Sequence, residues 1–229
     1  MNIKQLITSS CMGMATLLSF AQTAPWQDPR ISGINRLDNV SYFFAFENES
    51  LALDNDKSKS SRYLSIEGKW KFMWVKDSDK MSEEFASLGC DDSKWAEMPV
   101  PGMWELNGFG VPVYTNVPYE WSNQMVNNPP QVPVRDNHVG SYRRWFDIPA
   151  DWKGEKVFIH IGSATSNLSL YINGQYVGYS EDSKVAAEFD VTPYIKPGEK
   201  NLIAMQLMRW CDGTYLEDQD FWRLRGIAR

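Results

Sequence analysis

Histidine and cysteine are scarce in this chain, and their spacing supports no metal site. The 229 residues include three cysteines and only two histidines, His138 and His160. No C-x-x-C pair and no zinc-type cysteine–histidine spacing occurs. Neither histidine accompanies a serine or cysteine in a recognisable nucleophile motif, so a triad hydrolase is poorly supported. His160 lies in the apolar stretch VFIHIG, where we expect a hydrogen-bonded structural residue. We interpret Cys90 and Cys211 as separate thiols, although they could pair in an oxidising compartment.

Excess positive charge and long apolar runs are also lacking. The formal net charge is −6 at pH 7, which argues against a nucleic-acid backbone or an anionic membrane as the main partner. The apolar run near the amino terminus is too short, and too often interrupted by serine and glycine, to span a membrane comfortably. The sequence therefore predicts no membrane span.

The first residues have the features of an export signal. Lys4 supplies the positive start, an apolar run follows, and Ser19 and Ala21 place small residues at positions −3 and −1 of a cleavage site. We expect residues 1–21 to be a signal peptide cleaved after Ala21, and the protein to be periplasmic or secreted. The alternative is a disordered amino terminus. A lipoprotein attached through Cys11 is disfavoured, because apolar residues continue after that cysteine.

Alternation with a period of two is the main structural signal that is present. Hydrophobic residues make up 43% of the chain, enough for a core, and ten tryptophans provide flat apolar surfaces. Residues 68–75 alternate Trp, Phe and Trp with lysine and methionine, as in a half-buried strand. Asn173-Gly174 predicts a two-residue hairpin turn. Short strands about ten residues apart indicate an all-β, antiparallel β-sandwich. Residues 22–66 are expected to form an irregular arm.

An acidic cluster near the carboxyl end raises the possibility of glycosidase chemistry. Glu217, Asp218 and Asp220 lie between Trp210 and Trp222. Pairs of carboxyl groups break glycosidic bonds, and clustered carboxylates also bind cations. Carboxylates this close in sequence are more often paired with neighbouring arginines. The favoured interpretation is a structural ion-pair network with the nearby arginines, which are Arg209, Arg223, Arg225 and Arg229.

Two further polar residues are candidates for contact with a sugar. Asn116 stands among Tyr114, Tyr119 and Trp121 in a proline-rich, aperiodic loop, where an amide can read hydroxyl groups. It could equally be an ordinary turn asparagine. Asp182 follows a predicted strand, where its side chain could face a cleft, or where it could be an ordinary turn aspartate.

Several stretches, in order, carry a resemblance to a known family. They are WQDPRISGINRL, SIEGKWKF, VPVYTNVPY, GSYRRWFDIP, YINGQYVGYSEDSK, AEFDVTPYI and DGTYLEDQDFWRLRGIAR. Together they resemble the amino-terminal, sugar-binding domain of glycoside hydrolase family 2 β-galactosidases, over about residues 26–229. The resemblance implies a jelly-roll antiparallel β-sandwich, similar to galactose-binding domains, over residues 67–229. The family's immunoglobulin-like and TIM-barrel domains are expected to be absent from this chain.

The resemblance also implies a division of chemistry. A full-length parent would hydrolyse terminal non-reducing β-D-galactosides with retention, using two barrel glutamates that have no counterpart here. We therefore expect no catalytic residue in this chain and no appreciable activity. Asn116 and Asp182 match family positions that contact the galactosyl group, and Asp182 would help to hold Na⁺. A family Mg²⁺ site is expected in the missing barrel. The expected partners are a β-galactoside or galactose and the missing domains.

The sequence departs from the family pattern at its end. Arg225 stands where a small polar residue is usual, Ala228 stands where an aromatic residue is usual, and the chain then ends. We expect a truncated or frameshifted reading frame, or a fragment. Two alternatives stay open: a stand-alone carbohydrate-binding module, and an inactive remnant with an exposed apolar surface. The residues do not decide which galactoside is bound, and some family relatives act on glucuronides or mannosides.

Overall fold

The strands of the large sheet follow the alternation of their side chains. The computed structural model describes residues 24–217 and 220–229, so the expected signal peptide and Asp218 lie outside the described residues. In β2, the side chains of Trp70 and Phe72 are buried, whereas that of Lys69 is exposed. The strands are β1 (Gly33–Ile34), β2 (Gly68–Val75), β3 (Ala96–Val100), β4 (Gly102–Met103), β5 (Val113–Thr115), β6 (Val139–Asp147), β7 (Phe158–Ile161), β8 (Ala164–Thr165), β9 (Asn167–Ile172), β10 (Gln175–Glu181), β11 (Ala187–Asp190), β12 (Lys200–Met208), β13 (Phe221–Arg223) and β14 (Gly226–Ile227).

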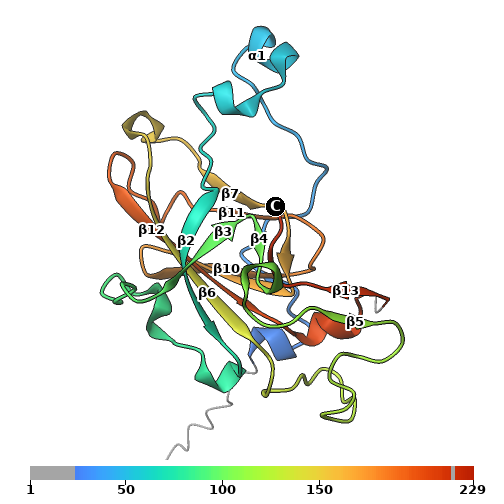
Figure 1. Cartoon of the computed structure of the whole chain (residues 1–229). Helices are drawn as coiled ribbons and strands as arrows, with labels where there is room; N and C mark the ends of the chain where they lie inside the picture. Colours follow the sequence, from blue (N-terminus) through green and yellow to red (C-terminus); the bar gives the residue numbers. More distant parts are fainter. Residues whose placement is uncertain (1–23, 218–219) are drawn as a thin grey trace, which may run out of the picture.

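These strands form one large sheet and three small ones, all with antiparallel pairing. The large sheet has seven strands in the order β1-β10-β9-β12-β6-β2-β3. The small sheets are β11-β7, β13-β5 and β4-β14-β8. Figure 1 shows the small sheets lying beside the large one. The expected all-β class and antiparallel sandwich are confirmed.

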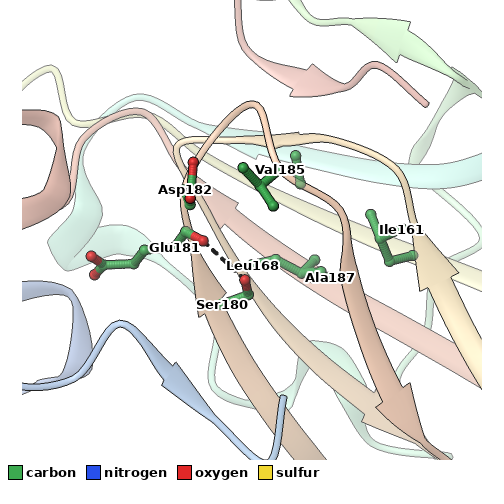
Figure 2. Close-up of a pocket in the computed structure, with 8 residues that line it drawn as sticks. Ile161, Leu168, Ser180, Glu181, Asp182, Val185 and Ala187 are labelled. Atoms are coloured by element: carbon green, nitrogen blue, oxygen red, sulfur yellow. Dashed lines mark hydrogen bonds between the residues drawn. The ribbon is translucent and has the colours of Figure 1, made fainter. Parts of the chain in front are cut away.

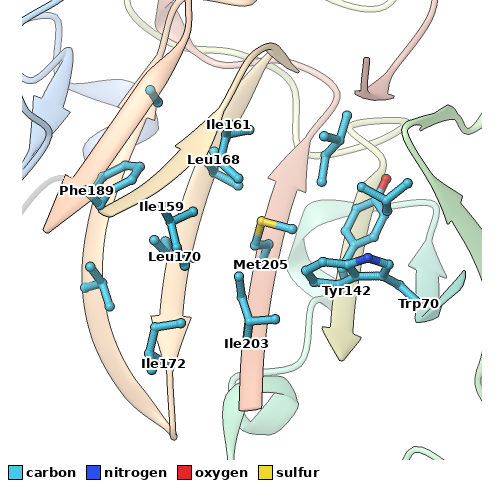
Figure 3. Close-up of a cluster of buried hydrophobic side chains, with 14 of the residues drawn as sticks. Trp70, Tyr142, Ile159, Ile161, Leu168, Leu170, Ile172, Phe189, Ile203 and Met205 are labelled. Carbon is cyan, nitrogen blue, oxygen red and sulfur yellow. The ribbon is translucent and has the colours of Figure 1, made fainter. Parts of the chain in front are cut away.

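The core lies between the large sheet and the strands that cover it. Leu168, Leu170 and Ile172 of β9 alternate inward and meet Ile159 and Ile161 of β7 (Figure 3). Burial of such side chains stabilises the fold by about 1.5–3 kcal/mol each. Further members of this cluster come from most strands of both layers, and include Trp70, Phe72, Trp104, Tyr142, Phe189, Ile203, Met205 and Ile227.

The expected hairpin turn is present between β9 and β10. Asn173 and Gly174 have φ angles of 52° and 81°, the left-handed values that a type I′ turn requires. The Asn173 side chain accepts a hydrogen bond from the Leu202 backbone at 2.9 Å and donates to the Tyr194 carbonyl at 2.9 Å. The turn is therefore tied to the neighbouring strand β12 as well as to its own hairpin.

The arm that precedes β2 contains little regular structure. Its first strand, β1, pairs with β10, so this part of the arm extends the large sheet. Farther on, α1 (Glu49–Asp54) begins after Asn48, whose side chain caps it, and Figure 1 shows this helix on a long loop that projects from the sheets. No helix in residues 24–217 or 220–229 combines the length and apolar character of a membrane span. The short 3-10 helices are Pro25–Gln27, Lys57–Lys59, Ser78–Lys80, Glu84–Ala86, Glu105–Asn107, Ala150–Trp152 and Asp212–Tyr215.

Candidate functional site

A two-stranded ribbon brings the Asn116 loop to the carboxyl-terminal segment. β5 pairs with β13, with Thr115 opposite Phe221 and Tyr114 opposite Trp222. Asn116 follows Thr115, and Asp220 precedes Phe221. In an antiparallel pair these two positions come next at the same end of the ladder. Asn116 and Asp220 therefore flank one end of the ribbon, and both are exposed.

The same ribbon presents aromatic rings to solvent. Tyr114 and Trp222 are 51% and 61% exposed, and their ring centroids are 5.6 Å apart. The Tyr114 hydroxyl donates a hydrogen bond to Asp220 Oδ1 at 2.6 Å, and this carboxylate raises the pKa of Tyr114. A carboxylate, an amide and two exposed rings thus gather on one short ribbon, which is a combination suited to a sugar.

Asp182 lies beside the same carboxyl-terminal segment. It follows β10 with a φ of 86° and is exposed at the rim of a small pocket, which Leu168 and Ala187 also line. Figure 2 shows Asp182 at this rim, with the Glu181 side chain directed away from those apolar residues. The described contacts do not join Asp182 directly to Asn116.

The loop after Asp182 nevertheless touches the ribbon segment. Ser183 Oγ donates a hydrogen bond to Glu217, and Lys184 Nζ lies 4.1 Å from the centroid of the Phe221 ring. Asn116 therefore adjoins Asp220 and β13, and the loop that begins at Asp182 contacts Glu217 and Phe221. Within the acidic cluster, Glu217 contacts the Asp182 loop and Asp220 contacts Tyr114.

A buried carboxylate that sequence reasoning missed holds this region together. Glu120, with a side chain 2% exposed, pairs with Arg209 at 2.8 Å, with Arg223 at 3.6 Å and with Arg225. Burial would raise the pKa of Glu120, but the positive charges of Arg225 and Arg209 outweigh burial and lower it. Three of the four arginines that the sequence singled out therefore pair with Glu120, which the prediction did not include, and the predicted pairing with Glu217, Asp218 and Asp220 stays a prediction. In the sequence, Glu120 stood out only as an acidic residue in an apolar, aromatic loop.

The ion pairs of Glu120 help to hold the β5–β13 ribbon in position. Glu120 lies four residues after Asn116, and Arg223 is the last residue of β13. Glu105, farther up the same loop, accepts a hydrogen bond from the Arg225 backbone at 2.8 Å. The chain is therefore fixed to the carboxyl-terminal segment by charge-assisted contacts both before β5, at Glu105, and after Asn116, at Glu120.

A second buried group of acids lies one residue before Asp182. Glu181, Cys211 and Asp212 are all buried, and their side-chain O and S atoms lie within 4.8 Å of one another. The Tyr179 hydroxyl donates to Glu181 Oε1 at 2.5 Å. Burial raises the pKa of Glu181 to about 8, and it also raises the pKa values of Cys211 and Asp212. Such a group can hold a cation, or it can retain a proton between its two carboxyls.

The remaining thiol and imidazole groups have structural surroundings. Cys90 and Cys211 are not paired with each other, as expected from the sequence. His160 Nδ1 lies 2.8 Å from Glu188 Oε1, which confirms the expected hydrogen-bonded role. Burial, together with the charge of Arg209, lowers the pKa of His138 to about 4, so this ring is neutral at pH 7.

Comparison with known proteins gives matches over most of the chain. The family model described as "Glycosyl hydrolases family 2, sugar binding domain" matches residues 63–229. A β-galactosidase of Priestia megaterium (strain DSM 319 / IMG 1521) is 39% identical over 217 residues, which cover 92% of this chain and 21% of that relative. Beta-galactosidase 2 of Enterobacter cloacae is 38% identical over 216 residues, covering 93% of this chain and 20% of that relative. The chain spans about a fifth of the length of these relatives.

Solved structures show the same fold. The crystal structure of a β-glucuronidase from Bacteroides uniformis matches 72% of this chain and 17% of its own, with a TM-score of 0.54 and 24% identity. At that identity the likeness concerns the fold alone. The family model, in contrast, covers everything from the end of the arm onward, and so the chain belongs to glycosyl hydrolase family 2, whose sugar-binding domain it contains.

Proposed function

We propose that this chain supplies the galactoside-reading side chains of a β-galactosidase whose bond-breaking residues lie in other domains. The observation that carries the proposal is the β5–β13 ribbon, which places Asn116 and Asp220 at one end beside two exposed aromatic rings. The β-galactosidase relatives, which are about five times longer than this chain, support it.

The proposed readers have complementary hydrogen-bonding abilities. The Asn116 amide can donate to one sugar oxygen and accept from a hydroxyl, whereas a carboxylate only accepts. The sequence assigns the carboxylate role to Asp182, and that assignment stays part of the proposal. The ribbon geometry adds Asp220, because Asp220 adjoins Asn116 at the end of one ladder.

A sodium ion at Asp182 also stays a proposal. Asp182 offers one exposed carboxylate, whereas a hard cation prefers several oxygen ligands. The neighbouring Glu181 carboxylate is buried and accepts a hydrogen bond from Tyr179, so Na⁺ would need further oxygens from the sugar or from other parts of the enzyme. A bound Na⁺ would fix the position of a sugar hydroxyl. The expected Mg²⁺ belongs to the proposed barrel, outside this chain.

For the full-length parent we propose retaining hydrolysis of terminal non-reducing β-D-galactosides. In retaining enzymes a nucleophilic carboxylate forms a covalent glycosyl intermediate that water then hydrolyses. We place both carboxyl groups in the expected barrel. This chain would orient the galactose and would itself be inactive. Export to the periplasm or medium, by the signal peptide over residues 1–21, completes the proposal.

Ligand-detected NMR with methyl β-galactoside tests the role of this chain. Saturation-transfer titration of the purified chain should detect weak binding, with a dissociation constant in the millimolar range, because part of the pocket is absent. Asn116→Ala and Asp220→Asn should each weaken this binding about fivefold or more, the loss of one hydrogen bond to a charged or polar group. The control is Glu155→Gln, at an exposed residue just after the 3-10 helix Ala150–Trp152. Equal binding by all four proteins would contradict the proposal.

A stand-alone carbohydrate-binding module is the second candidate function. The exposed Tyr114 and Trp222 rings favour it, because such rings stack on sugars. Calorimetric titration with galactose, lactose and cellobiose separates the two candidates. Micromolar affinity for one of these sugars would favour the module, and millimolar affinity would favour the domain of a larger enzyme.

A further inference from the structure

Two asparagine–glycine pairs occur in the chain, Asn107-Gly108 and Asn173-Gly174. At such a pair the backbone nitrogen of the glycine can attack the side-chain amide of the asparagine, because glycine has no Cβ to hinder the approach. The amide nitrogen then leaves as ammonia. The rate depends on how freely the asparagine side chain can turn toward that backbone nitrogen, and the fold treats the two pairs differently.

The first pair lies on an open turn. Asn107 is the last residue of the 3-10 helix Glu105–Asn107, and both Asn107 and Gly108 are exposed. Among the described residues, the Asn107 side chain has one hydrogen-bond partner, the Met103 carbonyl, which accepts from Nδ2 at 2.7 Å. The Gly108 nitrogen donates to no backbone oxygen of those residues. Apart from its chain neighbours, no atom lies within 4 Å of the place that a Cβ of residue 108 would take. Both reacting groups are therefore accessible.

The second pair is held by the neighbouring chain. Asn173 Oδ1 accepts a hydrogen bond from the Leu202 backbone nitrogen at 2.9 Å, and Nδ2 donates to the Tyr194 carbonyl at 2.9 Å and to Asn201 Oδ1 at 2.8 Å. A rotation that brings the amide carbon of Asn173 to the Gly174 nitrogen would break all three bonds. It would also leave polar atoms of these partners without their partner, which costs more than losing a bond to water.

We infer that Asn107 is a site of spontaneous deamidation in the folded chain, and that the contacts of Asn173 protect the second pair. The Gly108 nitrogen forms a bond to Asn107 Cγ and gives its proton to water or hydroxide, while the side-chain nitrogen takes up a proton and leaves as ammonia. Water then opens the resulting five-membered imide at one of its two carbonyl groups. The balance is one water consumed and one ammonia released, and the product is aspartate or isoaspartate.

This modification would change the turn that leads toward β5. A carboxylate cannot donate a hydrogen bond, so the contact with the Met103 carbonyl would be lost. The new negative charge would stand two residues after Glu105, whose carboxylate accepts a hydrogen bond from the Arg225 backbone. Isoaspartate would also add one atom to the main chain between the 3-10 helix and β5. The inference does not depend on sugar binding by the ribbon.

Mass spectrometry of the aged chain tests the site. The purified full chain is kept folded at pH 8 for several days and then digested with trypsin, which separates the two asparagines because lysines and arginines lie between them. Deamidation adds one mass unit, and fragmentation of each peptide assigns it to a residue. We expect Asn107 to convert at least about tenfold faster than Asn173, because two more hydrogen bonds must break before Asn173 can react.

Two controls separate the fold from the local sequence. In the chain unfolded by urea, the two asparagines should convert at rates within about twofold of each other, because neither keeps its native contacts. Asn107→Gln keeps an amide at an exposed position but must close a larger ring, so it should remove the fast conversion and leave that of Asn173 unchanged.

The comparison of the two asparagines decides the inference. Conversion of Asn173 as fast as that of Asn107 in the folded chain would overturn it. So would an unmodified Asn107 in the folded chain over the time in which the unfolded chain converts, since the turn would then protect this pair as well.

Discussion

At the residue scale, buried charge decides how the carboxyl-terminal segment is held. Glu120 is surrounded by Arg209, Arg223 and Arg225, and all but Arg209, which is 12% exposed, are nearly inaccessible to water. Burying an ion pair need not stabilise a fold compared with apolar residues, but removing one partner leaves uncompensated buried charge. The Asn116 loop therefore depends on one carboxylate for its position.

Replacing Glu120 by glutamine should be strongly destabilising. We expect a loss of about 3–5 kcal/mol in the free energy of unfolding, because three guanidinium groups lose their shared carboxylate. Urea denaturation measures it. The control is Glu97→Gln, which removes an exposed ion pair with Lys69 and should change the stability far less, because solvent screens that pair. Similar losses in both variants would show that the Glu120 network contributes no more than a surface pair.

Glu181 should make stability depend on pH in a defined direction. Its pKa is raised from 4.5 to about 8 in the folded chain, mainly by burial. The folded state therefore holds a proton that the unfolded state releases between these values. The contribution to stability is complete below pH 4.5 and is lost as the pH rises through 8. Glutamine resembles the protonated form, so Glu181→Gln should remove this loss.

Denaturation at pH 5.5 and pH 8 tests this direction. Glu181→Gln should gain roughly 3 kcal/mol of stability relative to the unmodified chain between pH 5.5 and pH 8, because the unmodified chain loses most of the Glu181 contribution over this interval. The exposed Glu199→Gln serves as the control and should show the same difference at both pH values. An equal effect of Glu181→Gln at both pH values would mean that Glu181 is already ionised in the folded chain.

At the scale of elements, the β9–β10 hairpin combines a local turn with long-range contacts. The left-handed backbone of Asn173 and Gly174 is a local property that any chain with this dipeptide can adopt. The Asn173 side chain, however, bonds to residues far along the chain, in and just before β12, including Asn201 at 2.8 Å. The turn therefore aligns β9 with two neighbours at once.

Two substitutions separate these contributions in the hairpin. Asn173→Gly keeps the left-handed backbone but removes the side-chain hydrogen bonds to Tyr194, Asn201 and Leu202, so we expect a loss of about 2–3 kcal/mol. Gly174→Ala keeps those bonds and strains the backbone at a φ of 81°, with an expected loss of about 1 kcal/mol. Thermal unfolding ranks the two variants. A larger loss for Gly174→Ala would assign the stability to the turn geometry alone.

At the scale of the whole molecule, the chain corresponds to about a fifth of its β-galactosidase relatives. Its candidate sugar-reading residues lie at the surface, on a ribbon at the edge of the sandwich, and not in an enclosed pocket. An open site of this kind binds weakly by itself, since a small ligand gains most of its affinity from surfaces that enclose it. Other parts of a longer enzyme would complete the enclosure.

The isolated chain should therefore not hydrolyse β-galactosides. Incubation of the purified chain with a chromogenic β-galactoside is expected to give no release above the buffer blank, since we place both catalytic carboxyl groups in the expected barrel. A full-length family 2 β-galactosidase provides the positive control. Turnover comparable with that control would contradict both the proposed division of chemistry and the role given to Asn116 and Asp220.

Local patterns in the sequence predicted much of the sandwich. The strand over residues 68–75 coincides with β2, and the strands on both sides of Asn173-Gly174 coincide with β9 and β10. These features follow from neighbours in the chain, because alternation and turn geometry involve only a few residues. The pairing of β1 with β10 was not predicted, since a strand of two residues carries no periodic signal.

The sequence by itself determined the all-β class, the hairpin and the family, since these depend on local patterns and on motifs that are contiguous in the chain. Only the tertiary structure decided that Asp220 adjoins Asn116, that Glu120 is the centre of the arginine network, and that Glu181 meets Asp212. These partners are tens of residues or more apart in the chain. Their contact depends on strand register and on which loops the core brings together, and neither property is encoded in the spacing of the residues themselves.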